Sequence, residues 1–313
     1  MASPTPLHRL VRLLSLTLLG AALAPTLPAA GAAASAAAAQ APTPAAPSSR
    51  WDLADFIDGL PDLLAERLPS FDRTGALRVY VRPHFGDLIH RDYLRVPCGA
   101  RAKITENFES SGELQTYFTH GMADAAGYGL SGLRLGAKGE RVLPALNDGA
   151  GFSLGLNFQT PLSRPPQDLT DGHRHTQPYV AATRPLIPDW KLLGFASIGA
   201  DLLERTALPA HFGRNQLHAN SLIFVAGAAR EWPRFRASLT ATLTTSSLLS
   251  NEHKNVYALR PEIVVPWKAR PAAHTQILFT LGGRTIWGPD GHELGLSSSV
   301  RIEFLLRRDR GLP

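Results

Sequence analysis

A serine between two glycines is the first feature of this sequence that could do chemistry. Residues 151–155 read Gly-Phe-Ser-Leu-Gly, the G-x-S-x-G spacing at which a serine acts as a nucleophile in many hydrolases. Such a serine must stand on a sharp turn between a strand and a helix, where its hydroxyl reaches a base. Ser153 lies instead in the middle of a regularly alternating segment. We therefore expect it to face a polar interior and to have no catalytic role.

Two histidines two residues apart could bind a metal ion. His173 and His175 would share one face of a strand, which is a geometry that a metal can use. A zinc site needs three or four ligands, and the sequence offers no further ligand at a clear spacing. We therefore expect a histidine pair close to a loop, with no metal bound.

An integral-membrane lipid hydrolase is the enzymatic alternative that stays open. Its chemistry would need a serine and a histidine, with a third group that orients the histidine. The available sets are His218 with Ser221 and His253 with Asn251. No dinucleotide cofactor is expected, because no helix follows the G-x-G-x-x-G spacing at 127–132.

Many basic residues share a second pattern, since they take the polar phase of alternating segments. Ten follow it: Arg78, Arg82, Arg95, Arg101, Lys103, Arg134, Lys138, Arg236, Arg260 and Arg301. Only two acids, Glu262 and Glu303, clearly oppose them on that face. Charges in a membrane protein face a water-filled or protein-filled interior. The residues predicted to line a pathway are Arg95, Arg101, Lys103, Arg236, Arg260, Glu262, Arg301 and Glu303.

Two interpretations of these charges stay open. A ring of arginines and lysines would form a basic constriction that favours anions. Alternatively, the charges would pair with one another and fill a narrow interior, because a buried charge needs a partner.

The segments that position these residues alternate strictly between apolar and polar side chains. In residues 152–159, for example, every second residue is Phe or Leu. Such alternation predicts strands with one face in an apolar medium and one in a polar medium. Twelve segments follow it: 76–85, 92–105, 113–120, 128–138, 149–160, 173–184, 190–201, 216–230, 234–246, 254–267, 273–286 and 293–306. Most have the length of a tilted membrane-spanning strand, roughly nine to eleven residues or more, and exceed the usual soluble strand.

The connections between the segments fit a bacterial barrel with two unlike rims. Residues 187–189 and 231–233 would form tight turns on the side where the chain ends, while 161–171 and 204–214 would form longer loops opposite. Four tryptophans stand at strand ends, where an aromatic belt would place them: Trp190, Trp232, Trp267 and Trp287. Three prolines argue against the assignment, because Pro97, Pro178 and Pro261 fall inside predicted strands of a sheet without a free edge.

The N-terminal part has a different composition from the strands. Residues 1–39 have the basic start, short apolar run and small-residue sites of a signal peptide, and 40–50 form a flexible linker rich in Ala, Pro and Ser. Residues 51–70 predict an amphipathic acidic helix, with Pro61 as a possible kink. The net charge is −4 over 51–75 and +7 over 76–313, out of +6 for the chain. We therefore hypothesise that the helix enters or caps the basic lumen as a plug; a helix on the membrane surface is the alternative.

One phrase of the sequence resembles a known group of proteins. Residues 129–138, Gly-Leu-Ser-Gly-Leu-Arg-Leu-Gly-Ala-Lys, look like the repeated strand phrase of small Gram-negative outer-membrane barrels described as transporters. These include a family described as transporters of a phenol-degradation pathway. The resemblance covers 76–313 as a pattern and implies passive transport or a structural role. Such barrels end on a strand whose C-terminal aromatic is read by the assembly machinery; here Phe304 precedes nine further residues.

The sequence thus predicts an all-β protein of the cell outer membrane. Its fold would be a transmembrane antiparallel up-and-down barrel of about twelve strands, without disulfides because Cys98 is the only cysteine. We expect a non-enzymatic channel or transporter for small polar or anionic solutes; a lipid hydrolase and a purely structural barrel are the alternatives. The expected partners are outer-membrane lipids, small solutes and the barrel-assembly machinery. Nucleic acid is not expected, because the basic residues are spread singly, and no cofactor is expected.

Overall fold

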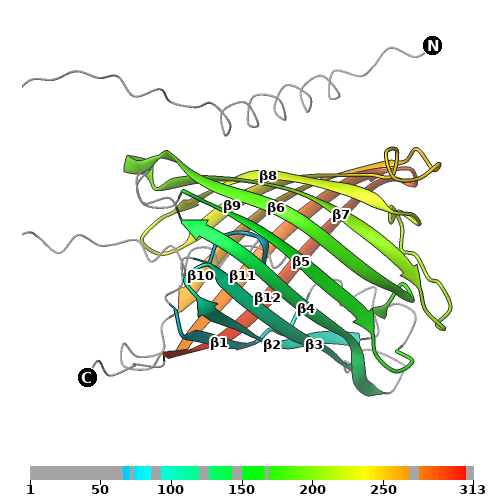
Figure 1. Cartoon of the computed structure of the whole chain (residues 1–313), viewed down its shortest axis with the longest axis horizontal. Coiled ribbons are helices and arrows are strands. Elements are labelled where there is room, and N and C mark those ends of the chain that lie inside the picture. Colours follow the sequence, from blue (N-terminus) through cyan, green and yellow to red (C-terminus); the bar gives the residue numbers. More distant parts are fainter. Residues whose placement is uncertain are drawn as a thin grey trace, which may run out of the picture. The chain divides into compact units, whose positions relative to one another are not determined.

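The structure is a computed structural model, and it describes residues 66–70, 74–85, 93–119, 127–142, 150–165, 169–267 and 275–307. Twelve antiparallel strands in these ranges close into a barrel in which each strand pairs with its sequence neighbours and β1 pairs with β12 (Figure 1). The strands are β1 (Ala76–Val81), β2 (Tyr93–Thr105), β3 (Phe108–Thr119), β4 (Tyr128–Val142), β5 (Gly151–Pro161), β6 (His173–Ile187), β7 (Leu192–Arg205), β8 (Ser221–Glu231), β9 (Arg236–Thr245), β10 (Asn255–Trp267), β11 (Thr275–Gly288) and β12 (Gly291–Arg307).

The predicted number of strands and the up-and-down order are confirmed. Most strand ends lie within a few residues of their predicted positions, and three differ for local reasons. β3 starts at Phe108, five residues early, because only Glu106 and Asn107 separate it from β2. β7 starts at Leu192, because Pro188–Trp190 form a short 3-10 helix. β8 starts at Ser221, since residues 216–220 belong to the preceding loop.

The two faces of the barrel wall differ in chemistry. Large apolar side chains cover the outside, such as Leu154, Leu281 and Leu296, which are 62, 62 and 78% exposed. Lysines, arginines and glutamates are buried on the inside. A closed barrel satisfies every strand edge by pairing, which a sheet in lipid requires. No helix in the described ranges is long and apolar enough to cross a membrane.

The two rims of the barrel are unlike, as expected. β1 starts and β12 ends at one rim, which we call the terminal rim, and the tight turns after β2, β6 and β8 lie there. The opposite rim, here the loop rim, carries the long loops 162–172 and 206–220. The four tryptophans lie at strand ends or in turns, with Trp190, Trp232 and Trp267 at the terminal rim and Trp287 at the loop rim.

Pro97, Pro178 and Pro261, the prolines expected inside predicted strands, lie within strands without changing their register. Pro97 in β2 lies beyond the paired part of β1, where its carbonyl accepts a hydrogen bond from the N–H of Arg82. Pro178 and Pro261 lie at interruptions of the β6–β7 and β10–β11 ladders, and the pairing resumes in the same register on both sides. Each proline thus lies where a strand end or a gap in the ladder requires no backbone N–H donor. The prolines are therefore compatible with the predicted strands.

Three inward aromatic rings lie over glycines of the neighbouring strand. Tyr80 is paired with Gly99, Tyr179 with Gly155, and Phe195 with Gly227. A Cβ atom on any of these glycines would stand only 2.5–2.6 Å from an atom of the ring. Each ring therefore packs on bare backbone, which leaves room for a large side chain in a narrow interior.

Candidate functional site

Ion pairs fill the interior near the terminal rim. Lys138 of β4 lies 3.0 Å from Glu109 of β3 and 3.4 Å from Glu140, while Lys103 of β2 pairs with Glu140. All four side chains are almost wholly buried. Strands β2, β3 and β4 are thus joined by side-chain charges as well as by their backbone ladders.

A second group of ion pairs lies farther into the barrel. The Glu303 carboxylate of β12 accepts a hydrogen bond from Arg78 at 2.5 Å and forms an ion pair with Arg301 at 2.9 Å. Glu113 of β3 accepts the hydroxyl of Tyr80 at 2.9 Å. The Arg301 guanidinium lies 4.5 Å from the centroid of the Tyr80 ring, so this ring connects the two carboxylates.

Residues 66–70, which we call the lumen strap, are buried inside the barrel. The strap is hydrogen-bonded to β4, β5 and β6, and Arg67 also packs on Gly199 of β7; none of these strands is next to the strap in sequence. Ser70 donates its N–H and its hydroxyl to the Glu140 carboxylate at 3.0 and 2.8 Å. Lys138 donates to the carbonyl of Leu68 at 2.7 Å. The Glu140 carboxylate therefore binds the strap as well as Lys103 and Lys138.

Strands β5 and β6 hold the other half of the strap. Ser153 donates its hydroxyl to the carbonyl of Arg67, and Tyr179 donates to the carbonyl of Glu66 at 3.1 Å. The Glu66 carboxylate accepts Arg134 at 3.2 Å and Asn157 at 3.3 Å. Both faces of the strap are thus bound to the wall by hydrogen bonds with sequence separations of 68 to 113 residues.

The inner wall across from the strap is polar and keeps some solvent exposure. On β9 the inward residues include Ser238 and Thr242, and on β10 they include Arg260 and Glu262. These four side chains are half-buried, whereas most charges beside the strap are buried, Arg134 at 19% exposure being the exception. Strands β9 and β10 therefore present a partly exposed polar stretch of the inner wall.

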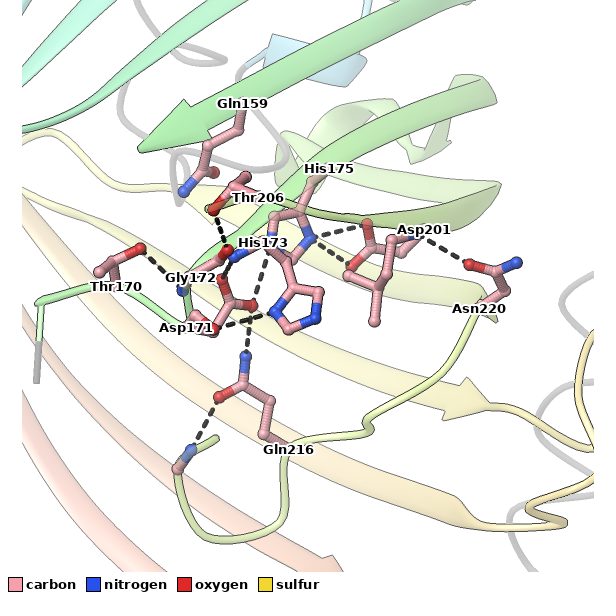
Figure 2. Close-up of polar contacts among 12 residues, drawn as sticks. Gln159, Thr170, Asp171, Gly172, His173, His175, Asp201, Thr206, Gln216 and Asn220 are labelled. Carbon is pink, nitrogen blue, oxygen red and sulfur yellow. Dashed lines mark hydrogen bonds and ion pairs between the residues drawn. The ribbon is translucent and has the colours of Figure 1, made fainter. Parts of the chain in front are cut away.

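A histidine between two carboxylates closes part of the interior at the loop rim (Figure 2). The ring of His175 has Asp201 Oδ1 2.9 Å from Nδ1 and Asp171 Oδ2 2.9 Å from Nε2. Because both ring nitrogens face carboxylate oxygens, both act as donors and the ring is an imidazolium. Asp171 also accepts the side-chain amide of Gln216 at 3.1 Å, which joins loop 162–172 to loop 206–220.

Asp171 is held in its charged form. Burial by itself would raise the pKa of the carboxyl group, but hydrogen bonds from His175 and from the backbone N–H of His173 lower that pKa below its ordinary value. The carboxylate therefore stays ionised well into acid, and the contact between the two loops stays in place with it.

Loop 206–220 also reaches the far side of the mouth. Asn215 and Asp290, in the turn between β11 and β12, exchange two hydrogen bonds, and Arg214 donates to the carbonyl of Asp290 at 2.8 Å. This loop connects β7 to β8, whereas the turn that it contacts connects β11 to β12, four strands further around the barrel. It is therefore fastened at both sides of the opening that it crosses.

The predicted pathway residues fall into two groups. Arg101, Lys103, Arg301 and Glu303 are buried at 2–5% exposure. The other four are half-buried on inward positions: Arg95, Arg236, Arg260 and Glu262. In the first group, Lys103, Arg301 and Glu303 take part in ion pairs. In the second, Arg236 pairs with Glu231 at 3.2 Å, and all four side chains keep some exposure to solvent. Their role in conduction stays a prediction.

Three inward acids were missed, and they change the charge balance. Glu109 and Glu140 lie just outside the predicted strand ends, and Glu113 is the first residue of a predicted strand. Longer predicted strands would have placed Glu109 and Glu140 on the inner phase, and Glu113 was already within a predicted strand. Together with Glu66 and Glu303, five glutamates are buried among the described residues, against seven buried lysines and arginines. The salt-bridge interpretation thus describes this part of the interior.

The other candidate sites take structural positions. Ser153 is fully buried and faces the interior as expected, with its hydroxyl bound to the strap. His173 donates from Nδ1 to the carbonyl of Asp171, and its ring packs 4.9 Å from that of Phe212. Among the described residues, no three histidine, cysteine, aspartate or glutamate side chains form a group that could hold a metal. Residues 1–65, which include the predicted signal peptide, the linker and most of the acidic helix, lie outside the described ranges.

No protein-family model matches the sequence, and no curated protein matches it. Several solved structures are similar in fold. An outer membrane channel from Pseudomonas putida F1 matches with a TM-score of 0.49 at 12% identity, over 75% of this chain and 97% of that one. The NanC porin gives 0.47 at 11%, over 73 and 100%, and the KdgM porin gives 0.45 at 7%, over 72 and 98%.

The barrel itself assigns the compartment. It has closed strand pairing, an apolar outer face and strands mostly of ten residues or more. These are the properties of a bacterial outer-membrane β-barrel, as the sequence predicted.

Proposed function

We propose that this protein is a narrow outer-membrane channel for small polar solutes, with a preference for anions. The partly exposed polar wall formed by β9 and β10, across from the buried strap, is the observation that carries this proposal. The strap and the ion pairs fill the side formed by β1–β6 and β12. A solute would therefore pass along Ser238, Thr242, Arg260 and Glu262.

The preference for anions rests on the charges beside this path. Seven buried lysines and arginines oppose five buried glutamates among the described residues, and Arg260 adds a half-exposed cation on the path itself. In a low-dielectric wall an excess of positive charge raises the local concentration of anions. Glu262 lies two residues from Arg260 on the same face and would keep the preference moderate.

The test is a current measurement on the refolded chain in a planar bilayer with asymmetric KCl. We expect discrete current steps and a reversal potential on the chloride side. Arg260→Gln should move the reversal potential toward zero, because it removes the cation on the path. Arg174→Gln is the matched control, since Arg174 pairs with Glu204 on the outer face near the loop rim and should leave the reversal potential unchanged.

A structural barrel without transport is the second candidate, and the buried strap favours it. Ion pairs and a strap that fill one side of the lumen would stiffen a barrel whether or not solute passes. Absence of current from a chain that shows heat-modifiable gel migration, and is therefore folded, would overturn the channel and support this role. A reversal potential on the potassium side would overturn the anion preference alone.

A further inference from the structure

Arg67, at the centre of the lumen strap, is a fully buried cation. Its side chain has no exposed surface, and none of its three guanidinium nitrogens has a hydrogen-bond partner among the described residues. The Tyr179 ring lies 5.4 Å from the guanidinium carbon. The chain thus buries a charged group with five N–H donors against the face of one ring.

The polar groups around Arg67 are already engaged elsewhere. The neighbouring carboxylate, Glu66, accepts Arg134 and Asn157. The carboxylate of Asp201 on β7 is bound to the ring of His175 through both oxygens. Glu66 and Asp201 are near enough to act on Arg67 electrostatically, but their oxygens are bound to other groups and accept no hydrogen bond from its guanidinium.

A second donor without a hydrogen-bond partner among the described residues lies on β7, the strand that also holds Asp201. Gly199 of β7 packs under the Arg67 guanidinium, since a Cβ atom there would stand 3.4 Å from Nη1. The next inward residue, Ser197, has a buried hydroxyl without a hydrogen-bond partner among the described residues. Two residues along a strand span about 7 Å, so the hydroxyl and the guanidinium border the same small region of the lumen.

A guanidinium stays protonated in a protein, and burying it without acceptors costs several kcal/mol or more. A small anion would supply the missing acceptors and a negative charge in direct contact with the guanidinium. We propose that Arg67, with Ser197 beside it, binds a small monovalent anion, a halide or a short carboxylate, between the lumen strap and β7. The bound anion fastens the strap to the wall.

The proposal is tested through folding stability, so it stands or falls separately from conduction. The refolded full chain is heated in gluconate at constant ionic strength, with chloride or formate replacing gluconate stepwise, and the unfolding midpoint is read from the gel shift. We expect a saturable rise of about 3 °C or more, because a ligand that binds only the folded state stabilises it. Arg67→Gln should abolish the rise, and Arg174→Gln should keep it.

Two further measurements cover a variant that fails to refold. Arg67→Lys keeps the charge but loses the planar fork, so the anion concentration at half-effect should rise about tenfold. Addition of the unmodified chain should broaden the chloride-35 resonance of the solution. Formate, which would compete for the same site, should narrow the resonance again. An unchanged midpoint together with an unbroadened chloride resonance would overturn the proposal and assign the space beside Arg67 to water. The same rise in Arg67→Gln would place the anion elsewhere and overturn it too.

Discussion

Asn215 and Asp290 join two loops across the mouth of the barrel. The N–H of Asn215 donates to Asp290 Oδ2 at 2.9 Å, and the N–H of Asp290 donates to Asn215 Oδ1 at 3.1 Å. Asn215 is buried, while its neighbour Arg214 is exposed. The pair therefore protects a loop that carries its own trypsin site.

Asn215→Ala should release this loop. Loss of the side-chain acceptor leaves the Asp290 N–H unpaired, which costs about 1–3 kcal/mol and corresponds to roughly tenfold or more opening. Cleavage after Arg214 by trypsin should accelerate by that factor. His218→Ala, in the same loop but without a role in this pair, is the control, and equal cleavage of both variants would contradict the prediction.

Removal of residues 51–70 should enlarge the channel. This segment contains the lumen strap, whose hydrogen bonds to Lys138, Ser153 and Tyr179 place it inside the barrel. Without it, we expect a larger unitary conductance in the planar bilayer. Removal of 40–50 alone is the control and should change nothing; identical conductance of all three chains would exclude the strap as an obstruction.

Glu140→Gln should destabilise the whole barrel. The carboxylate pairs with Lys103 and Lys138 and accepts two hydrogen bonds from Ser70. Its loss leaves buried ammonium groups with less countercharge, so we expect the free energy of unfolding to fall by about 3–5 kcal/mol. Urea titration followed by gel shift measures this. Glu204→Gln, at the exposed pair with Arg174, should cost about 1 kcal/mol or less.

The contact at Asp171 should weaken only in strong acid. Because its pKa is lowered in the folded protein, the carboxylate stabilises the fold above its ordinary pKa of about 3.9, and that contribution is lost as the pH falls through the lowered value. Urea midpoints between about pH 2 and about pH 7 measure the effect. Asp171→Asn should be less stable at neutral pH and should approach the unmodified chain in acid. A constant difference across the range would contradict the assignment.

The strands could be predicted because lipid and lumen impose opposite chemistry on alternate residues. Their ends could not, since Glu109 and Glu140 lie at a rim where the outward residues are no longer strictly apolar. These two acids and Glu113, which was missed inside a predicted strand, left the predicted interior too basic. The plug hypothesis came from the acidity of residues 51–70, whereas the strap itself has one glutamate and one arginine. Part of its hydrogen bonding comes from neutral groups such as Ser153 and Tyr179, which leave no charge pattern in the sequence. Contacts such as that between Asn215 and Asp290 depend on the closure of the barrel and leave no local signal.

The glycines under Tyr80, Tyr179 and Phe195 bear on how the barrel assembles correctly. A strand that slips by one residue turns its apolar side chains inward and is rejected by lipid. A slip by two residues restores that alternation, so the membrane cannot distinguish it from the native pairing. It would, however, move each ring off its glycine and against a side chain. These three ring-and-glycine pairs therefore disfavour a two-residue slip between β1 and β2, between β5 and β6, and between β7 and β8, which the pattern of polarity alone does not exclude.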